Sequence, residues 1–204
     1  MRYVSQPGVL APRTAPGRPG STSHAAIERA AFRLFAERGF ERTTLAAIAD
    51  EVGVGRRTLF RYFASKNDIP WGRFDQSLDE FAHTLRSMPG ELPLWEAVHR
   101  AVLRFNDFDA DARPSHRERM LLILGTPALE AHLVLRYAQW RAVIARFVAD
   151  RRGLDPDDLL PRLVGQVSLA VTLSSYGVWL QEPGRDLLGV LDESKSALRD
   201  LLTA

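Results

Sequence analysis

The sequence contains no cysteine among its 204 residues, and it has few features of an exported or repetitive protein. Without cysteine the chain can form no disulfide, thiolate metal site or thiol nucleophile, a composition that indicates the reducing cytoplasm. Residues 1–22 lack the continuous apolar stretch of a secretory signal. No internal repeat is apparent, which excludes solenoids and propellers. Because 46% of the residues are apolar and 25% are charged, we expect a compact soluble protein.

Short motifs of catalysis and metal binding are also missing. There is no G-x-S-x-G and no Walker loop, and Gly53-Val54-Gly55 lacks the third glycine and the preceding strand of a dinucleotide-binding loop. The histidines show neither the H-E-x-x-H spacing nor a cysteine partner; they are His24, His83, His99, His116 and His132. We therefore expect no catalytic residue, no metal and no cofactor. A cofactor-independent helical enzyme built from distant residues stays open as an alternative.

The charges are unevenly distributed along the chain. Residues 1–66 carry 11 Lys and Arg against 5 Asp and Glu, a net charge of +6, whereas residues 67–204 carry 16 against 20, a net charge of −4. A basic first third joined to an acidic remainder indicates that the first part meets a polyanion while the rest does something else. Charge alone does not distinguish nucleic acid from a membrane surface.

One segment is long and apolar enough to be weighed as a membrane span. It covers residues 163–181, between Arg162 and Glu182, and carries no charge. Its Gln, Ser and Thr side chains are too numerous for a lone lipid-facing helix. We expect this helix to be buried in protein, and we expect no membrane partner.

The pattern is helical almost throughout, so the predicted fold class is all-α. In residues 24–38 apolar side chains fall at i, i+3, i+4, i+7 and i+8, the spacing of a helix that packs on one side. Gly39 and Gly53 are expected to end the first two helices. Nine helices are predicted, over residues 24–38, 44–52, 55–62, 66–87, 93–108, 115–124, 127–152, 156–181 and 185–202.

Two capping boxes and two prolines predict where later helices begin. In a capping box a hydroxyl and a carboxylate three residues later satisfy backbone N–H groups of the first turn. Proline is favoured at the first helical position because its missing N–H would have no partner there. These signals are Ser65 with Asp68, Ser115 with Glu118, and the prolines at positions 127 and 156.

The two short helices at 44–52 and 55–62, joined by Gly53-Val54, have the spacing of a helix-turn-helix. In such a unit the second helix enters the major groove, where an arginine can donate two parallel hydrogen bonds to guanine. Arg56 and Arg57 are expected to read bases, and Gly55 would let the backbone approach closely. The full DNA-contacting set, including groups expected to hold phosphates, is Thr44, Gly55, Arg56, Arg57, Arg61, Tyr62 and Lys66.

Residues 1–22 add a flexible basic arm, rich in Pro and Gly, whose Arg13 and Arg18 could reach a minor groove. The alternative is that the short helices are a structural hairpin and that the arginines form a solvated face. A basic surface of that kind would bind partners without reading DNA sequence.

The stretch from Ala30 to Ile69, AAFRLFAERGFERTTLAAIADEVGVGRRTLFRYFASKNDI, resembles the DNA-binding domain of the TetR family of one-component repressors. By resemblance, Thr44, Arg56, Arg57, Tyr62 and Lys66 occupy DNA-contact positions of the family. Where many members have tyrosine this chain has Phe60, which puts one phosphate hydrogen bond in doubt. The elements that match, in the family's order, are Phe35, Gly39, Thr43-Thr44, Ile48-Ala49, Gly53-Val54, Leu59, Tyr62-Phe63 and Lys66.

The resemblance implies a nine-helix homodimer whose C-terminal part binds a small molecule and so changes the spacing of two DNA-reading heads. The implied units are the arm over residues 1–22, a helix-turn-helix domain over 23–66, and a ligand-binding and dimerisation domain over 67–204. In the family, the last two long helices form a four-helix bundle between subunits. Dimer contacts are expected at Ser168, Thr172 and Ser175 on one of these helices and at Leu191 and Leu198 on the other. The leucine stripe of the last helix could equally pack within one subunit.

Segments after residue 64 extend the resemblance to a subgroup of the TetR family. SKNDIPWGRFD, FNDFD, HRERMLLIL, TPAL and LRYAQWRAVIARFVADR look like the mycofactocin-system transcriptional regulators. The subgroup implies control of genes for a peptide-derived redox cofactor, with long-chain acyl-CoA as the effector.

Large side chains on the later helices could line an apolar effector cavity. Any one of them could equally be an ordinary core residue. His116, next to Arg117 and Arg119, would either meet an anionic ligand or belong to a solvated helix end. The expected lining is Trp71, Trp95, Phe105, Met120, Trp140, Tyr176 and Trp179.

Together these patterns predict a cytoplasmic, ligand-responsive repressor that binds a palindromic double-stranded DNA operator as a homodimer. Its effector is expected to be apolar or amphipathic. Two other classes of protein remain open, the helical enzyme and the basic-surface interaction protein.

Overall fold

A computed structural model describes residues 22–203, which form nine α-helices, two short 3₁₀ turns and no strand. The predicted all-α, nine-helix fold is confirmed. The arm expected over residues 1–22 lies outside the described residues, except for Thr22. The helices are α1 His24–Arg38, α2 Leu45–Glu51, α3 Arg56–Phe60, α4 Phe74–Arg86, α5 Leu94–Phe105, α6 His116–Gly125, α7 Glu130–Arg152, α8 Leu159–Gln181 and α9 Leu187–Thr203, and the turns are η1 Lys66–Trp71 and η2 Pro127–Leu129.

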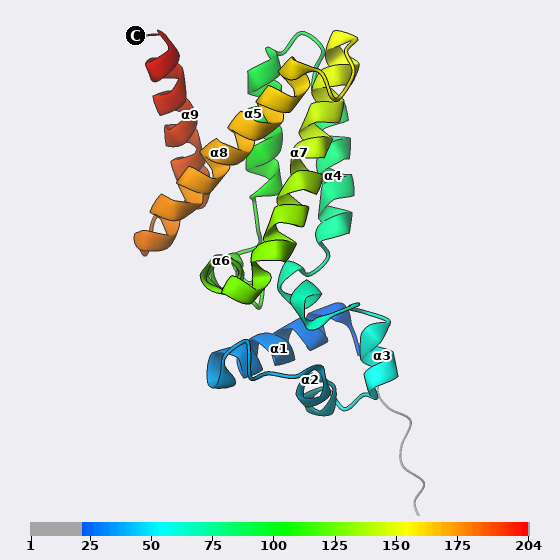
Figure 1. Cartoon of the computed structure of the whole chain (residues 1–204). Coiled ribbons are helices and arrows are strands. Elements are labelled where there is room, and N and C mark those ends of the chain that lie inside the picture. The colour runs from blue at the N-terminus through cyan, green and yellow to red at the C-terminus, as the bar shows by residue number, and fades with distance from the viewer. Residues whose placement is uncertain (1–21, 204) are drawn as a thin grey trace, which may run out of the picture.

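The helices form two layers that share one core (Figure 1). Helices α1, α2 and α3 gather at one end, and α4, α5 and α7 stand above them as a bundle. Helix α8 crosses this bundle obliquely, α9 packs along α8, and α6 lies near the junction with α1. Buried apolar side chains are continuous from Ile27 on α1 to Leu191 on α9.

Local signals explain the unit formed by α1, α2 and α3. Ser23 accepts a hydrogen bond from the backbone N–H of Ala26 and so caps α1, and Thr44 caps α2 through Ala47 in the same way. Gly53 has a φ of +68°, a left-handed conformation that favours glycine, so the chain can turn sharply before α3. The helix-turn-helix geometry thus follows from the caps and the turn.

The close packing of α7 against α8 depends on one small residue. A Cβ built at Gly165 would lie 3.0 Å from the carbonyl oxygen of Arg141, so glycine permits the approach of the two backbones. Helix α8 is the segment that is long and apolar enough to cross a membrane by length and composition. In the described structure it packs against α7 and α9 and buries residues such as Leu169 and Trp179.

The single helix predicted over residues 66–87 is wrong. Pro70 and Gly72, the latter with a φ of +58°, leave a 3₁₀ turn at Lys66–Trp71, and α4 begins only at Phe74. Ser65 donates a 2.8 Å hydrogen bond to the Asp68 carboxylate and makes no side-chain cap, so no capping box forms there.

Of the other three predicted helix starts, one is confirmed and two lie a few residues later in the structure. Ser115 and Glu118 form the predicted capping box at the start of α6. Pro127 begins a 3₁₀ turn, and α7 follows from Glu130. Pro156 lies in a turn, and α8 begins at Leu159, after Asp158.

Candidate functional site

The outer surface of the helix-turn-helix is formed by α3 and the residues around it. Gly55 takes the N-cap position of α3, and a Cβ built there would meet no heavy atom within 4 Å. The interior of the protein therefore does not require glycine at this position. The space in front of Gly55 is open to a partner.

Three arginines of the predicted DNA-contacting set, Arg56, Arg57 and Arg61, are exposed on α3 and at its C-terminal end. Among residues 22–203 none of the three has an ion-pair or side-chain hydrogen-bond partner. Phe60, on the same short helix, is 52% exposed. Unpaired guanidinium groups beside an exposed ring can donate to phosphates or to base edges.

Two residues expected to hold phosphates have partners inside the protein. The Tyr62 hydroxyl donates a 2.7 Å hydrogen bond to the carbonyl oxygen of Thr22. The Lys66 ammonium group donates to the carbonyl oxygens of Phe40, at 2.8 Å, and Glu41, at 3.3 Å. Both side chains are half-buried, and these bonds position the segments on either side of α3. An anion could use only the third N–H of Lys66.

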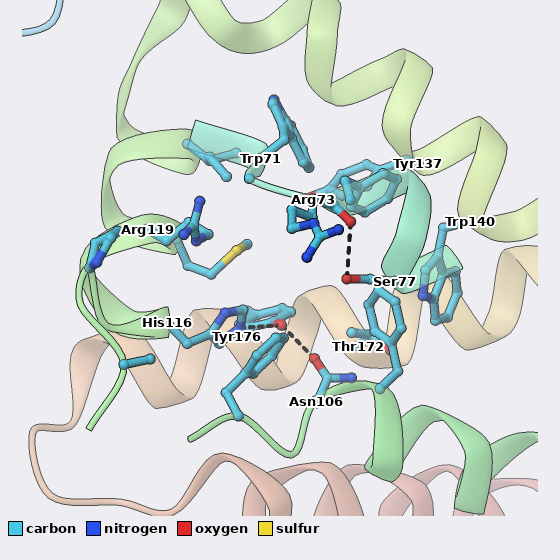
Figure 2. A pocket seen from close by; sticks show the side chains of 18 of the residues that line it. Trp71, Arg73, Ser77, Asn106, His116, Arg119, Tyr137, Trp140, Thr172 and Tyr176 are labelled. Atoms are coloured by element: carbon cyan, nitrogen blue, oxygen red, sulfur yellow. Dashed lines mark hydrogen bonds between the residues drawn. The ribbon is translucent and has the colours of Figure 1, made fainter. Parts of the chain in front are cut away.

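A cavity of about 420 Å³ lies within the upper bundle, a size in the range of small-molecule sites (Figure 2). Its wall comes from η1, α4, α5, α6, α7 and α8, from the loops before α4 and between α5 and α6, and from one residue of α1. Apolar and aromatic side chains dominate the lining. The cavity can therefore bury a largely apolar molecule.

The structure brings together five of the seven residues predicted to line a cavity, which are Trp71, Phe105, Met120, Trp140 and Tyr176. Trp95 and Trp179 do not line it. Trp95 faces α8 and α9 from the other side of α5. Trp179 lies about one turn beyond Tyr176 on α8, where its indole N–H donates to the carbonyl oxygen of Arg185. Periodicity placed these two tryptophans on the correct helices but could not give their direction.

A chain of hydrogen bonds forms one polar side of the cavity (Figure 2). The Tyr176 hydroxyl donates to Asn106 Oδ1 at 2.5 Å, and His116 Nε2 lies 2.7 Å from the Tyr176 oxygen. Because Tyr176 gives its only proton to Asn106, the His116 imidazole must donate from Nε2. Burial, with the charge of Arg119, lowers the pKa of His116 to about 3, so the imidazole is neutral near pH 7.

Two other lining residues carry polar atoms without a described partner. Trp71 Nε1 and the Tyr137 hydroxyl are buried and have no hydrogen bond within residues 22–203. Burial raises the pKa of Tyr137 to about 12, so its hydroxyl stays protonated. An unpaired buried donor costs about 1–3 kcal/mol. A ligand that accepts a hydrogen bond would remove that cost.

Polar lining residues that were missed from the sequence include Glu28, Asn106 and Tyr137. Of the cluster weighed for an anionic ligand, His116 and Arg119 line the cavity and Arg117 does not. Tyr137 stands three residues before Trp140 on α7, so helical spacing could have placed both on one face. Glu28 gave no signal, because a single acid on a helix beside apolar residues is normally solvated.

One ion pair connects the cavity wall to α1. Arg119 on α6 donates to Glu28 Oε2 on α1 at 2.5 Å and to the carbonyl oxygen of Pro70 at 2.5 Å. The two charged side chains are only 19% and 10% exposed, respectively. Both residues line the cavity, so a molecule bound there would touch the ion pair that joins α6 to α1.

A second arginine holds α6 to the end of α8. Arg117 donates hydrogen bonds to the carbonyl oxygens of Trp179, at 2.6 Å, and Leu180, at 3.1 Å. These carbonyls belong to the last turn of α8, where helix carbonyls lack partners within the helix. Helix α6 is thereby joined to α8 and, two residues later, to α1.

Four of the five residues expected at a dimer interface are instead buried within one chain. Ser168, Thr172, Ser175 and Leu191 have between 0% and 6% exposure. Ser175, for example, bonds to Ser194 of α9 at 2.8 Å. Leu198 alone is half-buried. This is a correction: the stripe of small residues packs α8 onto α5 and α9 of the same chain.

The outer face of α8 carries a different stripe. It is defined by Leu163, Ala170, Ser174, Gly177 and Val178, all of them exposed. Their spacing of about seven, four and three residues places them on one side of the helix. Small side chains along this outer face leave room for another helix to approach.

The fold, the arginine-bearing α3 and the apolar cavity together define a class of protein that comparisons identify. The family model described as "Bacterial regulatory proteins, tetR family" matches residues 27–69, and "MftR C-terminal domain" matches residues 92–203. The chain belongs to the TetR family of transcriptional regulators, whose members bind DNA operators, act as dimers and bind small-molecule effectors. The resemblance seen in the sequence is confirmed.

Within this family, the similarity points to a particular type of regulator. The chain is 42% identical over 175 residues to a protein of Mycobacterium tuberculosis (strain ATCC 25618 / H37Rv) named as the mycofactocin biosynthesis transcriptional regulator MftR, covering 86% of this chain and 88% of that one. The solved complex of SmeT with triclosan has a TM-score of 0.61 at 20% identity, over 85% of this chain and 90% of that chain.

A second solved structure has a bound ligand of another kind. It is Thermus thermophilus FadR in complex with lauroyl-CoA, with a TM-score of 0.55 at 25% identity, and it covers 88% of this chain and 93% of that one. Both solved structures share the all-helical arrangement of this chain.

Proposed function

We propose that this regulator is a ligand-responsive repressor that binds a palindromic operator as a homodimer and leaves it when an amphipathic effector fills the cavity. The observation that carries the proposal is the cavity wall itself, which includes Glu28 of α1 as well as residues of the upper bundle. A molecule bound there would touch a helix of the DNA-reading unit. Such direct contact supplies the differential affinity that a ligand needs to shift a two-state equilibrium.

In this proposal residues 23–66 read DNA and residues 67–204 hold the effector and the dimer interface. Exposed Arg56 and Arg57 read bases, with Gly55 allowing close approach, and Thr44 and Arg61 hold phosphates. Tyr62 and Lys66 act mainly by fixing the position of α3. The partner subunit packs on the outer face of α8, and the protein acts in the cytoplasm.

We propose a long-chain acyl-CoA as the effector and genes of mycofactocin metabolism as the targets. The apolar lining suits an acyl chain, and the unpaired Tyr137 hydroxyl suits a carbonyl or another acceptor. The similarity to the protein named MftR supports the target genes. The lauroyl-CoA bound to the FadR of Thermus thermophilus supports the class of effector.

The deciding experiment is fluorescence anisotropy with labelled DNA flanking the protein's own gene, compared with scrambled DNA over a salt series. Specific binding that palmitoyl-CoA reverses, and that coenzyme A alone does not, is the expected result. Equal and steeply salt-dependent binding to both DNAs, and to fragments selected from a random library, would refute the repressor and favour a non-specific basic surface.

A further inference from the structure

The ion pair between Glu28 and Arg119 is the place where the cavity, α6 and α1 meet. Arg119 uses one amino group for the Glu28 carboxylate and the other for the carbonyl oxygen of Pro70, in the turn before α4. The guanidinium group also lies 5.4 Å from the ring centroid of Phe32 on α1. One side chain therefore holds together η1, α6 and α1, the first helix of the DNA-reading unit.

The backbone of Gly72 packs closely against both side chains of the ion pair. A Cβ built at Gly72 would lie 3.1 Å from Arg119 Nη1 and 3.2 Å from a Glu28 carboxylate oxygen. The positive φ of this residue, +58°, adds a second reason for glycine here. The backbone of Gly72 is thus part of the compartment that holds the two charges.

Besides Arg119, the cavity lining offers an anion few cationic partners. Arg73 and Arg119 are its two cationic lining residues, and Glu28 and Asp109 its two anionic ones. His116 is neutral for the reasons given above. In Figure 2 Arg119 lies on the side of His116, and Arg73 lies nearer to Ser77 and Tyr137. The remaining lining is apolar or uncharged.

We propose that the effector carries an anionic group which binds Arg119 in place of Glu28, and that this exchange of anions separates α1 from α6. The inference rests on the proposed function, because it assigns the release of DNA to the effector. The common chemistry is an anion on an amphipathic molecule, either a carboxylate or the phosphates of coenzyme A.

The physical reason lies in what the exchange leaves behind. Arg119 keeps an anionic partner, so its half-buried charge stays compensated. Glu28 loses its partner while it is only 10% exposed. An unpaired buried carboxylate is strongly unfavourable, and the carboxylate can regain hydration only if α1 moves away from α6. An uncharged ligand of the same shape leaves the ion pair intact.

Ligand binding alone, without DNA, tests the exchange. Trp71 and Trp140 line the cavity, so their fluorescence reports its occupation. The probes are palmitate, palmitoyl-CoA and hexadecanol, and circular dichroism checks that each variant is folded. Removal of the competing carboxylate in Glu28→Gln is expected to tighten the binding of an anionic probe about tenfold, the value of one charge-assisted contact. Hexadecanol affinity should not change.

Arg119→Gln is the reciprocal variant. It should bind palmitate and palmitoyl-CoA no better than hexadecanol, because the anion has lost its partner. If palmitate alone gains affinity in Glu28→Gln, the anion is a carboxylate; if palmitoyl-CoA alone gains, it is a phosphate. Equal affinity of wild type and Glu28→Gln for both anionic probes would overturn the proposal. Should Glu28→Gln fail to fold, Arg119→Gln decides by the same comparison.

DNA binding gives a second readout, in which the direction of the change in DNA affinity tests the proposal. Neutralising an acid in the basic DNA-reading unit should strengthen DNA binding by long-range electrostatics. The proposal predicts the opposite for Glu28→Gln, a weaker complex and a smaller release by palmitoyl-CoA. The matched control is Glu51→Gln, which removes the same charge and breaks the exposed ion pair with Arg33, far from the cavity lining. Glu51→Gln should bind DNA at least as tightly as wild type.

The two readouts separate this proposal from the proposed function. If the wild-type protein binds no specific DNA, while Glu28→Gln binds the anionic probes more tightly than wild type does, the repressor is refuted and the exchange is kept. A wild-type protein released from DNA by palmitoyl-CoA, with Glu28→Gln and Glu51→Gln behaving alike in both assays, keeps the repressor and refutes the exchange.

Discussion

The Lys66 ammonium group lies 4.3 Å from the centroid of the Phe40 ring and donates a hydrogen bond to the carbonyl oxygen of that same residue. These contacts join η1 to the segment between α1 and α2. The lysine thus fixes the shape of the helix-turn-helix from inside. A residue that resembles a phosphate contact in the sequence has a structural role in the fold.

Lys66→Met should therefore lower the free energy of unfolding by about 1–3 kcal/mol, since two carbonyl oxygens lose a charged donor while the apolar stem is kept. Urea denaturation followed by circular dichroism measures the change. Arg57→Met is the control, because Arg57 is exposed and has no described partner, and it should leave stability unchanged. Equal stability of the Lys66 variant and wild type would show that the contact contributes nothing.

Arg57→Ala should weaken specific operator binding by about 1–3 kcal/mol, the value of a bidentate contact with a base, and should affect scrambled DNA much less. Anisotropy titrations on both DNAs measure the difference. Arg152→Ala removes the same charge at the exposed end of α7 and should change neither titration. A uniform loss on every DNA would make Arg57 a phosphate contact instead of a base contact.

Ser174→Glu should dissociate the homodimer, because it places an uncompensated charge in the middle of the outer face of α8. Sedimentation velocity would then show the mass of a monomer. Ala138→Glu adds the same charge at an exposed position of α7 and should leave a dimer. A dimeric Ser174 variant would move the interface elsewhere, with the half-buried Leu198 as the next position to charge.

Tyr137→Phe and Tyr176→Phe should change stability in opposite directions. The Tyr137 hydroxyl has no described partner, so its removal should raise the free energy of unfolding by about 1 kcal/mol and weaken effector binding. The Tyr176 hydroxyl bonds to both Asn106 and His116, so its removal should lower stability by a similar amount. Thermal denaturation with and without palmitoyl-CoA measures both effects. Two shifts of the same sign would contradict this account.

The neutral, buried His116 should make stability depend on pH. Its pKa is about 3 in the folded chain and near 6.5 when unfolded, so only the unfolded state binds the proton between these values. Stability should fall as the pH drops from 6.5 towards 3. In His116→Gln, which keeps a side-chain N–H donor, the slope should be smaller by up to about 1.4 kcal/mol per pH unit. Parallel profiles for variant and wild type would exclude this origin.

Sequence patterns were sufficient for the elements but not for the directions of their side chains. Caps such as Thr44 and Ser115 act within one helical turn, so the sequence shows them directly. The break at Pro70 and Gly72 was missed because the apolar periodicity continues through it. Proline outweighs periodicity there, since it removes a backbone donor.

In the candidate sites, too, the sequence predicts what local structure determines and misses what tertiary packing determines. Exposure of Arg56 and Arg57 follows from a local helix, and the sequence was sufficient to expect it. The burial of Ser168 and Ser175 depends on which side of α8 the chain itself covers, and one helical stripe fits either solution. The pair of Glu28 and Arg119 joins residues 91 positions apart, and no local pattern contains such a contact.

Helix α6 is held at two points that lie only two residues apart. Arg117 is bound to the last turn of α8, and Arg119 is bound to α1. At about 1.5 Å of rise per residue, some 3 Å of helix separates the anchor on α8 from the anchor on α1. We therefore expect a rotation of α6 about its anchor on α8 to move the anchor on α1 as well, because less than one turn of helix joins the two.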